Sequence, residues 1–191
     1  MKHLIIYAHP SADSLNSYLK NVVVSQIQQN GHEVRLRDLY TIGFDPVLSL
    51  DDVVGQRGGP MPSDVLVEQE HITWADVLTF IYPIWWTGLP AIMKGYIDRV
   101  FSYGFAYRYD HGVQKGSFTG KQTVIINTHG KSKAEYESMG MDDALSLTSD
   151  DGIYRYCGLD VKQHFFFDCA DQPAVDSIER WTKELKAFYV Y

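Results

Sequence analysis

Five short apolar runs, separated by segments with helical spacing, dominate the hydrophobic and polar pattern of the chain. Their side chains are largely β-branched or aromatic, which favours strands, and the second run alternates apolar with basic residues, as an edge strand does. This order of strands and helices predicts βαβ units that build a parallel sheet. The expected strands cover residues 3–8, 33–39, 77–82, 122–127 and 161–167.

The segments between the runs carry apolar stripes that predict helices. The first stripe runs from Leu15 to Ile27, and Gly31 follows as a natural helix stop. Pro90 stands where the helix after the third run would begin, because a missing N–H costs little at that position. Further helices are expected over residues 63–75, 93–101, 142–156 and 178–188.

Residues 40–62 are expected to form one long irregular loop, because glycine and proline recur throughout the stretch. A loop of this size inside a compact domain usually has a function, such as a lid or a subunit contact. A tolerated insertion is the alternative, since long surface loops cost little free energy.

The expected fold class is α/β, with a doubly wound five-stranded parallel sheet of order 2-1-3-4-5 and helices on both faces. A chain of 191 residues fits a single domain of this kind, spanning residues 1–191. In this strand order the chain reverses between the first and third strands, and ligands bind outside the carboxyl ends of the strands at such a point. Residues 9–16 and 83–88 are therefore expected to meet at a binding site.

Two adjacent tryptophans, Trp85 and Trp86, follow the third run directly. The preceding Pro83 cannot donate to a strand ladder, so the strand is expected to end there. Exposed indoles are unfavourable unless something covers them, and a stacked planar ligand is one such cover. Packing of both indoles in the core is the alternative, because tryptophan is usually well buried.

The loop after the first run leads into a helix with hydroxyl and amide side chains, notably Ser14 and Asn16. Unpaired backbone N–H groups and the helix dipole attract an anion such as a phosphate at this position. The loop matches neither the glycine-rich dinucleotide motif nor the P-loop. A plain N-cap by Asp13 or Ser14 is the alternative, and it is favoured when the loop is considered by itself. His9 is likewise open to being only a hydrogen-bonded loop residue.

A polar turn, Thr128-His129-Gly130, follows the fourth run and is expected to lie opposite the tryptophans. A glycine there permits close approach of a ligand to the backbone, although a simple turn also uses one. Tyr136 either presents its phenol to the same site or caps the core.

Composition narrows the function classes. Hydrophobic residues make up 45% and charged residues 21%, which are globular values, and 17 basic against 24 acidic residues give a net charge of −7. This charge argues against a nucleic-acid partner. No apolar stretch reaches the roughly 20 residues that span a bilayer, so no membrane insertion is expected. Cys157 and Cys169 form no CxxC motif, and the N-terminus lacks the features of a signal peptide, so a reducing, cytoplasmic setting without a metal centre is expected.

Taken together, these motifs resemble the flavodoxin-like NAD(P)H quinone dehydrogenases, including the ancillary quinone reductases of bacterial potassium-efflux systems. The resemblance is carried by Ala8-His9-Pro10 with Ser14 and Asn16, by residues 83–91 continuing to Lys94, and by residues 128–136. It implies a flavin whose phosphate end lies on the first loop and whose ring rests between the tryptophans and the turn after the fourth strand. The implied cofactor-binding residues are His9, Ser14, Leu15, Asn16, Pro83, Ile84, Trp85, Trp86, Thr128, His129 and Gly130.

The resemblance also implies an activity. Members of the family pass a hydride from NAD(P)H to the flavin, and then two electrons to a quinone or similar acceptor in the same place, by a ping-pong mechanism. Homodimers are usual, and Tyr136 matches a tyrosine that assists charge and proton movement. The position of a companion histidine holds Asp142 here, which leaves the proton relay unassigned. FMN is favoured over FAD, because Ala174 stands where an arginine helps hold the adenosine half, and the chain ends at Tyr191 without a long extension.

Two other functions stay open. The resemblance to ancillary reductases allows a regulatory subunit with a potassium-efflux transporter as its partner. The fold and the net charge of −7 allow a one-electron carrier of flavodoxin type.

Overall fold

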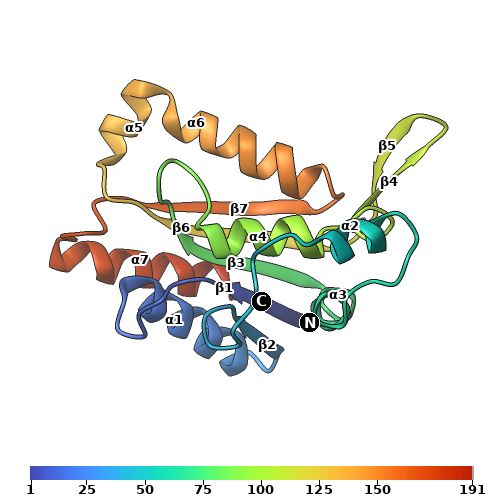
Figure 1. Cartoon of the computed structure of the whole chain (residues 1–191). Helices are drawn as coiled ribbons and strands as arrows, with labels where there is room; N and C mark the ends of the chain where they lie inside the picture. The colour runs from blue at the N-terminus through green and yellow to red at the C-terminus, as the bar shows by residue number, and fades with distance from the viewer. Residues whose placement is uncertain (191) are drawn as a thin grey trace.

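The computed structural model describes residues 1–190, and its centre is a five-stranded parallel sheet of order β2-β1-β3-β6-β7 (Figure 1). This is the predicted order, and β2 lies at an edge, as its alternating pattern indicated. Every pair of neighbouring strands in this sheet is parallel. The strands are β1 (Lys2–Tyr7), β2 (Glu33–Asp38), β3 (Val77–Pro83), β6 (Gln122–Thr128) and β7 (Asp160–Phe167).

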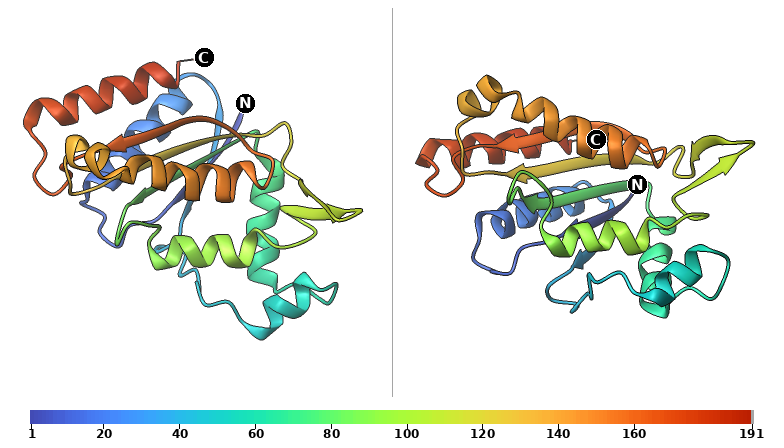
Figure 2. Two further views of the ribbon diagram at one scale, coloured as in Figure 1. Left: turned by 90° about the horizontal axis from the view of Figure 1, so that it is seen from above. Right: turned by 45° about the horizontal axis from the view of Figure 1, so that its top comes forward.

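Helices cover both faces of the sheet, as predicted (Figures 1 and 2). The apolar faces of α1 (Leu15–Gln29) and α7 (Val175–Phe188) pack on one side. The other side is covered by α3 (Ser63–Trp74), α4 (Ala91–Val100) and a π-helix (Leu147–Arg155). Two short helices, α5 (Lys133–Met139) and α6 (Met141–Ser146), precede the π-helix. The helix expected over residues 142–156 is therefore present, but it is an α-helix as far as Ser146 and a π-helix from Leu147.

Three features were not predicted. The short helix α5 lies where only a turn was expected. The stretch 40–62, expected to be irregular, contains α2 (Leu50–Gln56), whose start is fixed by a capping box between Ser49 and Asp52. A hairpin of β4 (Tyr107–Asp110) and β5 (Val113–Gly116) projects from the body of the molecule (Figure 2). Its two-residue turn has positive φ at both positions, which is the geometry that favours tight hairpins.

Arg99 on α4 holds the segment around α2 against the domain. Its Nε donates to both carboxylate oxygens of Asp52 at 3.1 Å, and its Nη1 donates to Asp64 on α3 at 2.7 Å and to the carbonyl of Asp45 at 2.7 Å. The Asp52 side chain is completely buried. Burial alone raises the pKa of Asp52, but hydrogen bonds from Arg99 and Ser49 outweigh that effect and hold the pKa below its usual 3.8.

The free energy of unfolding is expected to decrease as the pH falls from about 5 to about 3, in part because of Asp52. A folded-state pKa below the unfolded value means that the Asp52 carboxylate stabilises the fold above the unfolded pKa, and that this stabilisation is lost as the pH falls through the folded-state pKa. Urea unfolding at the two pH values measures the change. Asp52→Asn should make the change in the free energy of unfolding between the two pH values smaller. Asp151→Asn, which removes an exposed partner of Arg155, should leave that change as it is in the wild type. An equal change in all three proteins would contradict the role of Asp52.

None of the helices within residues 1–190 combines the length and the apolar character needed to cross a membrane.

Candidate functional site

The loops at the carboxyl ends of β1, β3 and β6 meet, as the strand order predicted. Asn16 is buried and donates through Nδ2 to Thr128 Oγ1 at 2.8 Å, which joins the loop after β1 to the end of β6. The ring of His9 lies 5.9 Å from that of Trp85, which brings the first loop beside the tryptophans. Segments that are far apart in the sequence therefore form one continuous surface.

Ser14 is the N-cap of α1, so the structural alternative for this residue is confirmed, and Asp13 is not the cap. The Ser14 hydroxyl accepts from the backbone N–H of Ser17 at 3.1 Å and donates to the carbonyl of Ser11 at 2.9 Å. His9 has a local partner as well, because its Nδ1 accepts from the backbone N–H of Ser11 at 3.1 Å. Leu15, the first residue of α1, is partly buried. The amino end of α1 nevertheless opens beside a cavity of about 230 Å³, which Lys20 and Tyr7 also line.

Both tryptophans lie outside the core, so the interpretation of core packing is wrong. The exposed fraction is 42% for Trp85 and 101% for Trp86. Trp86 and Thr87 adopt positive φ values of 50° and 56°, while Trp85 and Gly88 exchange backbone hydrogen bonds at 3.1 Å. The indoles in this tight turn are therefore exposed, whereas the neighbouring Pro83 and Ile84 are buried.

Pro83 and Ile84 form the buried base of the site. The Ile84 N–H donates to the carbonyl of Thr128 at 2.8 Å, which extends the β3–β6 ladder past Pro83. The Ile84 side chain packs with Tyr136 and Leu145 in a small apolar cluster. Tyr136 is therefore largely buried, and burial raises the pKa of its phenol.

The turn after β6 places two buried side chains, Thr128 and His129, next to an exposed Gly130. The His129 ring is stacked on Tyr136 at 4.2 Å, with an interplanar angle of 5°. Burial lowers the pKa of His129, although Asp168 opposes the shift. A Cβ at position 130 would lie 2.4 Å from Asp171 Oδ2, so a side chain there would require this exposed carboxylate to move.

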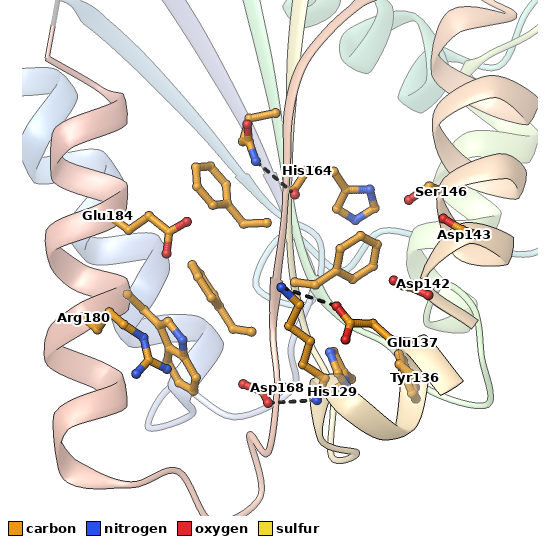
Figure 3. Close-up of a pocket in the computed structure, with 16 residues that line it drawn as sticks. His129, Tyr136, Glu137, Asp142, Asp143, Ser146, His164, Asp168, Arg180 and Glu184 are labelled. Atoms are coloured by element: carbon orange, nitrogen blue, oxygen red, sulfur yellow. Dashed lines mark hydrogen bonds and ion pairs between the residues drawn. The ribbon is translucent and has the colours of Figure 1, made fainter. Parts of the chain in front are cut away.

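A cavity of about 450 Å³ lies along β7 between α5–α6 and α7 (Figure 3). Of the predicted residues it contains His129 and Tyr136, with Asp142 also on its wall, but not the tryptophans. Acidic groups outnumber basic ones around it. The cavity therefore shares His129 and Tyr136 with the surface where the three loops meet, but it is not the slot between Trp85 and Thr128 that the motifs predict.

The buried polar atoms of the surface where the three loops meet suit a ligand that carries hydroxyl and phosphate groups. Asn16 is 4% exposed, yet its Oδ1 has no hydrogen-bond donor. An unpaired buried oxygen is unfavourable, and a ligand hydroxyl beside the amino end of α1 would supply the missing donor. Within residues 1–190 no three His, Cys, Asp or Glu side chains lie close enough together to hold a metal.

Sequence reasoning missed one buried polar group beside the site, formed by Asn127, Asp150 and His164. His164 contacts Asp150 Oδ1 at 2.9 Å and Asn127 Oδ1 at 2.7 Å. The only signals in the sequence were a histidine within the apolar run of β7 and an asparagine next to the predicted Thr128. Neither signal identifies a partner, because the contacts join residues 14 and 37 positions apart.

Comparison with known proteins gives consistent matches over nearly the whole chain. A family model described as a flavodoxin-like fold matches residues 1–188. A Haemophilus influenzae protein named an uncharacterized NAD(P)H oxidoreductase is 40% identical over 161 residues, which cover 84% of this chain and 80% of that protein. The rat protein NAD(P)H dehydrogenase [quinone] 1 is 30% identical over 97% of this chain and 77% of its own length. The solved NAD(P)H:quinone oxidoreductase from Methanothermobacter marburgensis superposes with a TM-score of 0.90 at 27% identity, covering 99% of this chain and 97% of that one.

Proposed function

Because the chain belongs to the flavodoxin-like family of NAD(P)H quinone dehydrogenases, we propose that it is a flavin-dependent NAD(P)H oxidoreductase with a quinone or similar acceptor. NAD(P)H and a proton reduce the quinone to its hydroquinone and leave NAD(P)⁺, so two electrons move in each turnover. The flavin supplies the means of accepting and returning the hydride. Donor and acceptor use one place in turn, which is a ping-pong mechanism.

The observation that carries this proposal is the hydrogen bond between Asn16 and Thr128, which joins the first loop to the third at the switch point of the sheet. In flavodoxin-like sheets FMN binds at this point. The amino end of α1 and Asn16 would hold the phosphate and the hydroxyl-bearing chain, with His9, Ser14 and Leu15 shaping the loop around them.

The flat ring would lie between the tryptophan turn and the turn after β6. Trp85 and Trp86 provide exposed aromatic surface on one side, above Pro83 and Ile84. On the other side lie Thr128, His129 and Gly130, with Tyr136 stacked behind His129. Covering the two indoles would remove apolar surface from water, which favours binding. FMN is favoured over FAD, because Ala174 has no charge to offer an adenosine half.

A homodimer in the cytoplasm is part of the proposal. The segment around α2 exposes apolar side chains close together in the chain, which supports a subunit contact there: Val47, Leu48, Leu50 and Val54. Both cysteines within the described residues are free, which suits a reducing compartment.

The purified protein is expected to be yellow and to oxidise NADH or NADPH rapidly only when a quinone is present. Heat release of the cofactor followed by mass measurement distinguishes FMN from FAD. Double-reciprocal plots at several quinone concentrations should be parallel, as a ping-pong cycle requires. A colourless protein that neither binds added flavin nor gains activity with it would overturn the proposal, and a stable complex with a transporter would favour the regulatory alternative.

A further inference from the structure

A chain of hydrogen bonds runs from the π-helix through β7 to β6 and β3, next to the proposed site. His164 on β7 lies between two oxygens, with Nδ1 2.9 Å from Asp150 Oδ1 and Nε2 2.7 Å from Asn127 Oδ1. All three side chains are less than a tenth exposed. Figure 3 shows His164 on the side of β7 that faces Ser146 and Asp143.

The hydrogen bonds define which atoms of the His164 ring face which partners. Asn127 Nδ2 donates to the carbonyl of Tyr82 at 2.9 Å, so Asn127 Oδ1 is the atom that faces His164, and it accepts from Nε2. On the other side of the ring, Nδ1 faces Asp150 Oδ1, which also lies 2.8 Å from Ser149 Oγ. The ring is therefore held from both sides.

Two local irregularities bring these groups together. Ser149 and Asp150 are adjacent residues of the π-helix and both are buried. In the β6–β7 ladder, Thr123 pairs with Val161 and Val124 with Gln163, so one residue of β7 is passed over. This shift sets which face of the sheet His164 reaches, since a slip of one residue reverses every side chain of a strand.

Two contacts of this hydrogen-bonded group lead to residues of the proposed flavin site. Tyr82, whose carbonyl accepts from Asn127, immediately precedes Pro83 and Ile84. On the other side, the His164 ring stacks on Phe166 at 3.9 Å, and Phe166 packs against the cluster of Ile84 and Tyr136. His164 thus supports the Ile84 region by a hydrogen-bonded route and by an apolar route.

We propose that His164, held between Asp150 and Asn127, is a positioning residue that fixes Asn127 and Phe166 and thereby the Pro83–Ile84 and Tyr136 wall of the flavin slot. The purpose of this positioning role rests on the proposed function, whereas the contacts of His164 do not. His164 touches neither the proposed ring position nor the tryptophans, so it acts only through its neighbours.

Nitrogen NMR of the wild-type protein tests this arrangement, and Nε2 of His164 is expected to carry a proton. Amide hydrogen exchange of Ile84 in flavin-free protein tests the positioning, because this N–H bonds across to Thr128 at 2.8 Å. In His164→Gln and in Asp150→Asn, Ile84 should exchange at least about tenfold faster relative to Ile5 on β1, and the dissociation constant for FMN should rise by about tenfold.

Gln69→Leu is the matched control, because it removes the buried hydrogen bonds from Gln69 Nε2 to the carbonyl of Val100 at 3.1 Å and to Ser102 Oγ at 3.0 Å, outside the β-sheet. It should leave the ratio of Ile84 to Ile5 exchange and the FMN affinity unchanged. The inference is overturned if Nε2 of wild-type His164 lacks its proton, or if His164→Gln keeps the wild-type exchange ratio. If the wild-type protein binds no flavin, the proposed function fails, while ring protonation and Ile84 exchange still decide the role of His164.

Discussion

Asn16→Leu is expected to weaken FMN binding by about 100-fold, because the change removes one hydrogen bond within the protein and one proposed contact with the ligand. Asn16 Nδ2 bonds to Thr128 Oγ1 at 2.8 Å, and Asn16 Oδ1 is buried without a donor. Leucine has a similar size and can fill the space, so the fold should remain intact. Quenching of flavin fluorescence on titration with FMN measures the dissociation constant, and urea unfolding checks the fold.

Two variants of Thr128 separate the bond between the loops from the contact with the ligand. Thr128→Ser keeps a hydroxyl for Asn16 and should bind FMN with nearly wild-type affinity. Thr128→Val removes that acceptor but leaves Asn16 Oδ1 in place, so its loss of affinity should be smaller than that of Asn16→Leu. A folded Asn16→Leu protein with wild-type affinity would show that the unpaired oxygen does not face the flavin.

The sheet could be predicted from the sequence because each of its strands has a recognisable local pattern of apolar residues. The runs that became β3 and β6 are continuous and apolar, as strands covered on both faces must be, and the alternation in β2 marked an edge. The hairpin of β4 and β5 lacked such a signal, since Tyr107–Asp110 and Val113–Gly116 are short and largely polar. The seven-residue helix α2 could not be recognised in the sequence either. Glycine and proline surround it, and its stability comes from tertiary contacts with Arg99.

The candidate site was predictable only as far as topology determines it. Strand order brought residues 9–16 and 128–130 to one edge, and the contact of Asn16 with Thr128 confirms that convergence. The exposure of Trp85 and Trp86 depends on positive φ values in their turn, which no periodicity encodes. The roles of Asp150 and His164 depend on a π-helix and a register shift, and both are decided by packing rather than by local preference.

Arg99→Met should lower the free energy of unfolding by about 3–5 kcal/mol, which is the cost of removing one partner from a buried ion pair. Arg99 is 5% exposed and supplies hydrogen bonds to Asp52, Asp64 and the carbonyl of Asp45. Methionine fills much of the volume but leaves the Asp52 carboxylate buried with only Ser49 as a donor. Urea unfolding followed by circular dichroism measures the loss, and the α2 segment should become sensitive to proteolysis first.

The double variant Arg99→Met with Asp52→Asn tests whether the unpaired charge is the cause. Asparagine removes the charge while retaining an oxygen for the Ser49 cap, so the double variant should regain part of the lost stability. Arg155→Met is the control, since its ion pair with Asp151 is about half exposed and should contribute less than about 1 kcal/mol. If Arg99→Met is no less stable than Arg155→Met, Arg99 does not hold α2 in place. The apolar side chains of that segment would then need another anchor, and the proposed dimer contact could provide it.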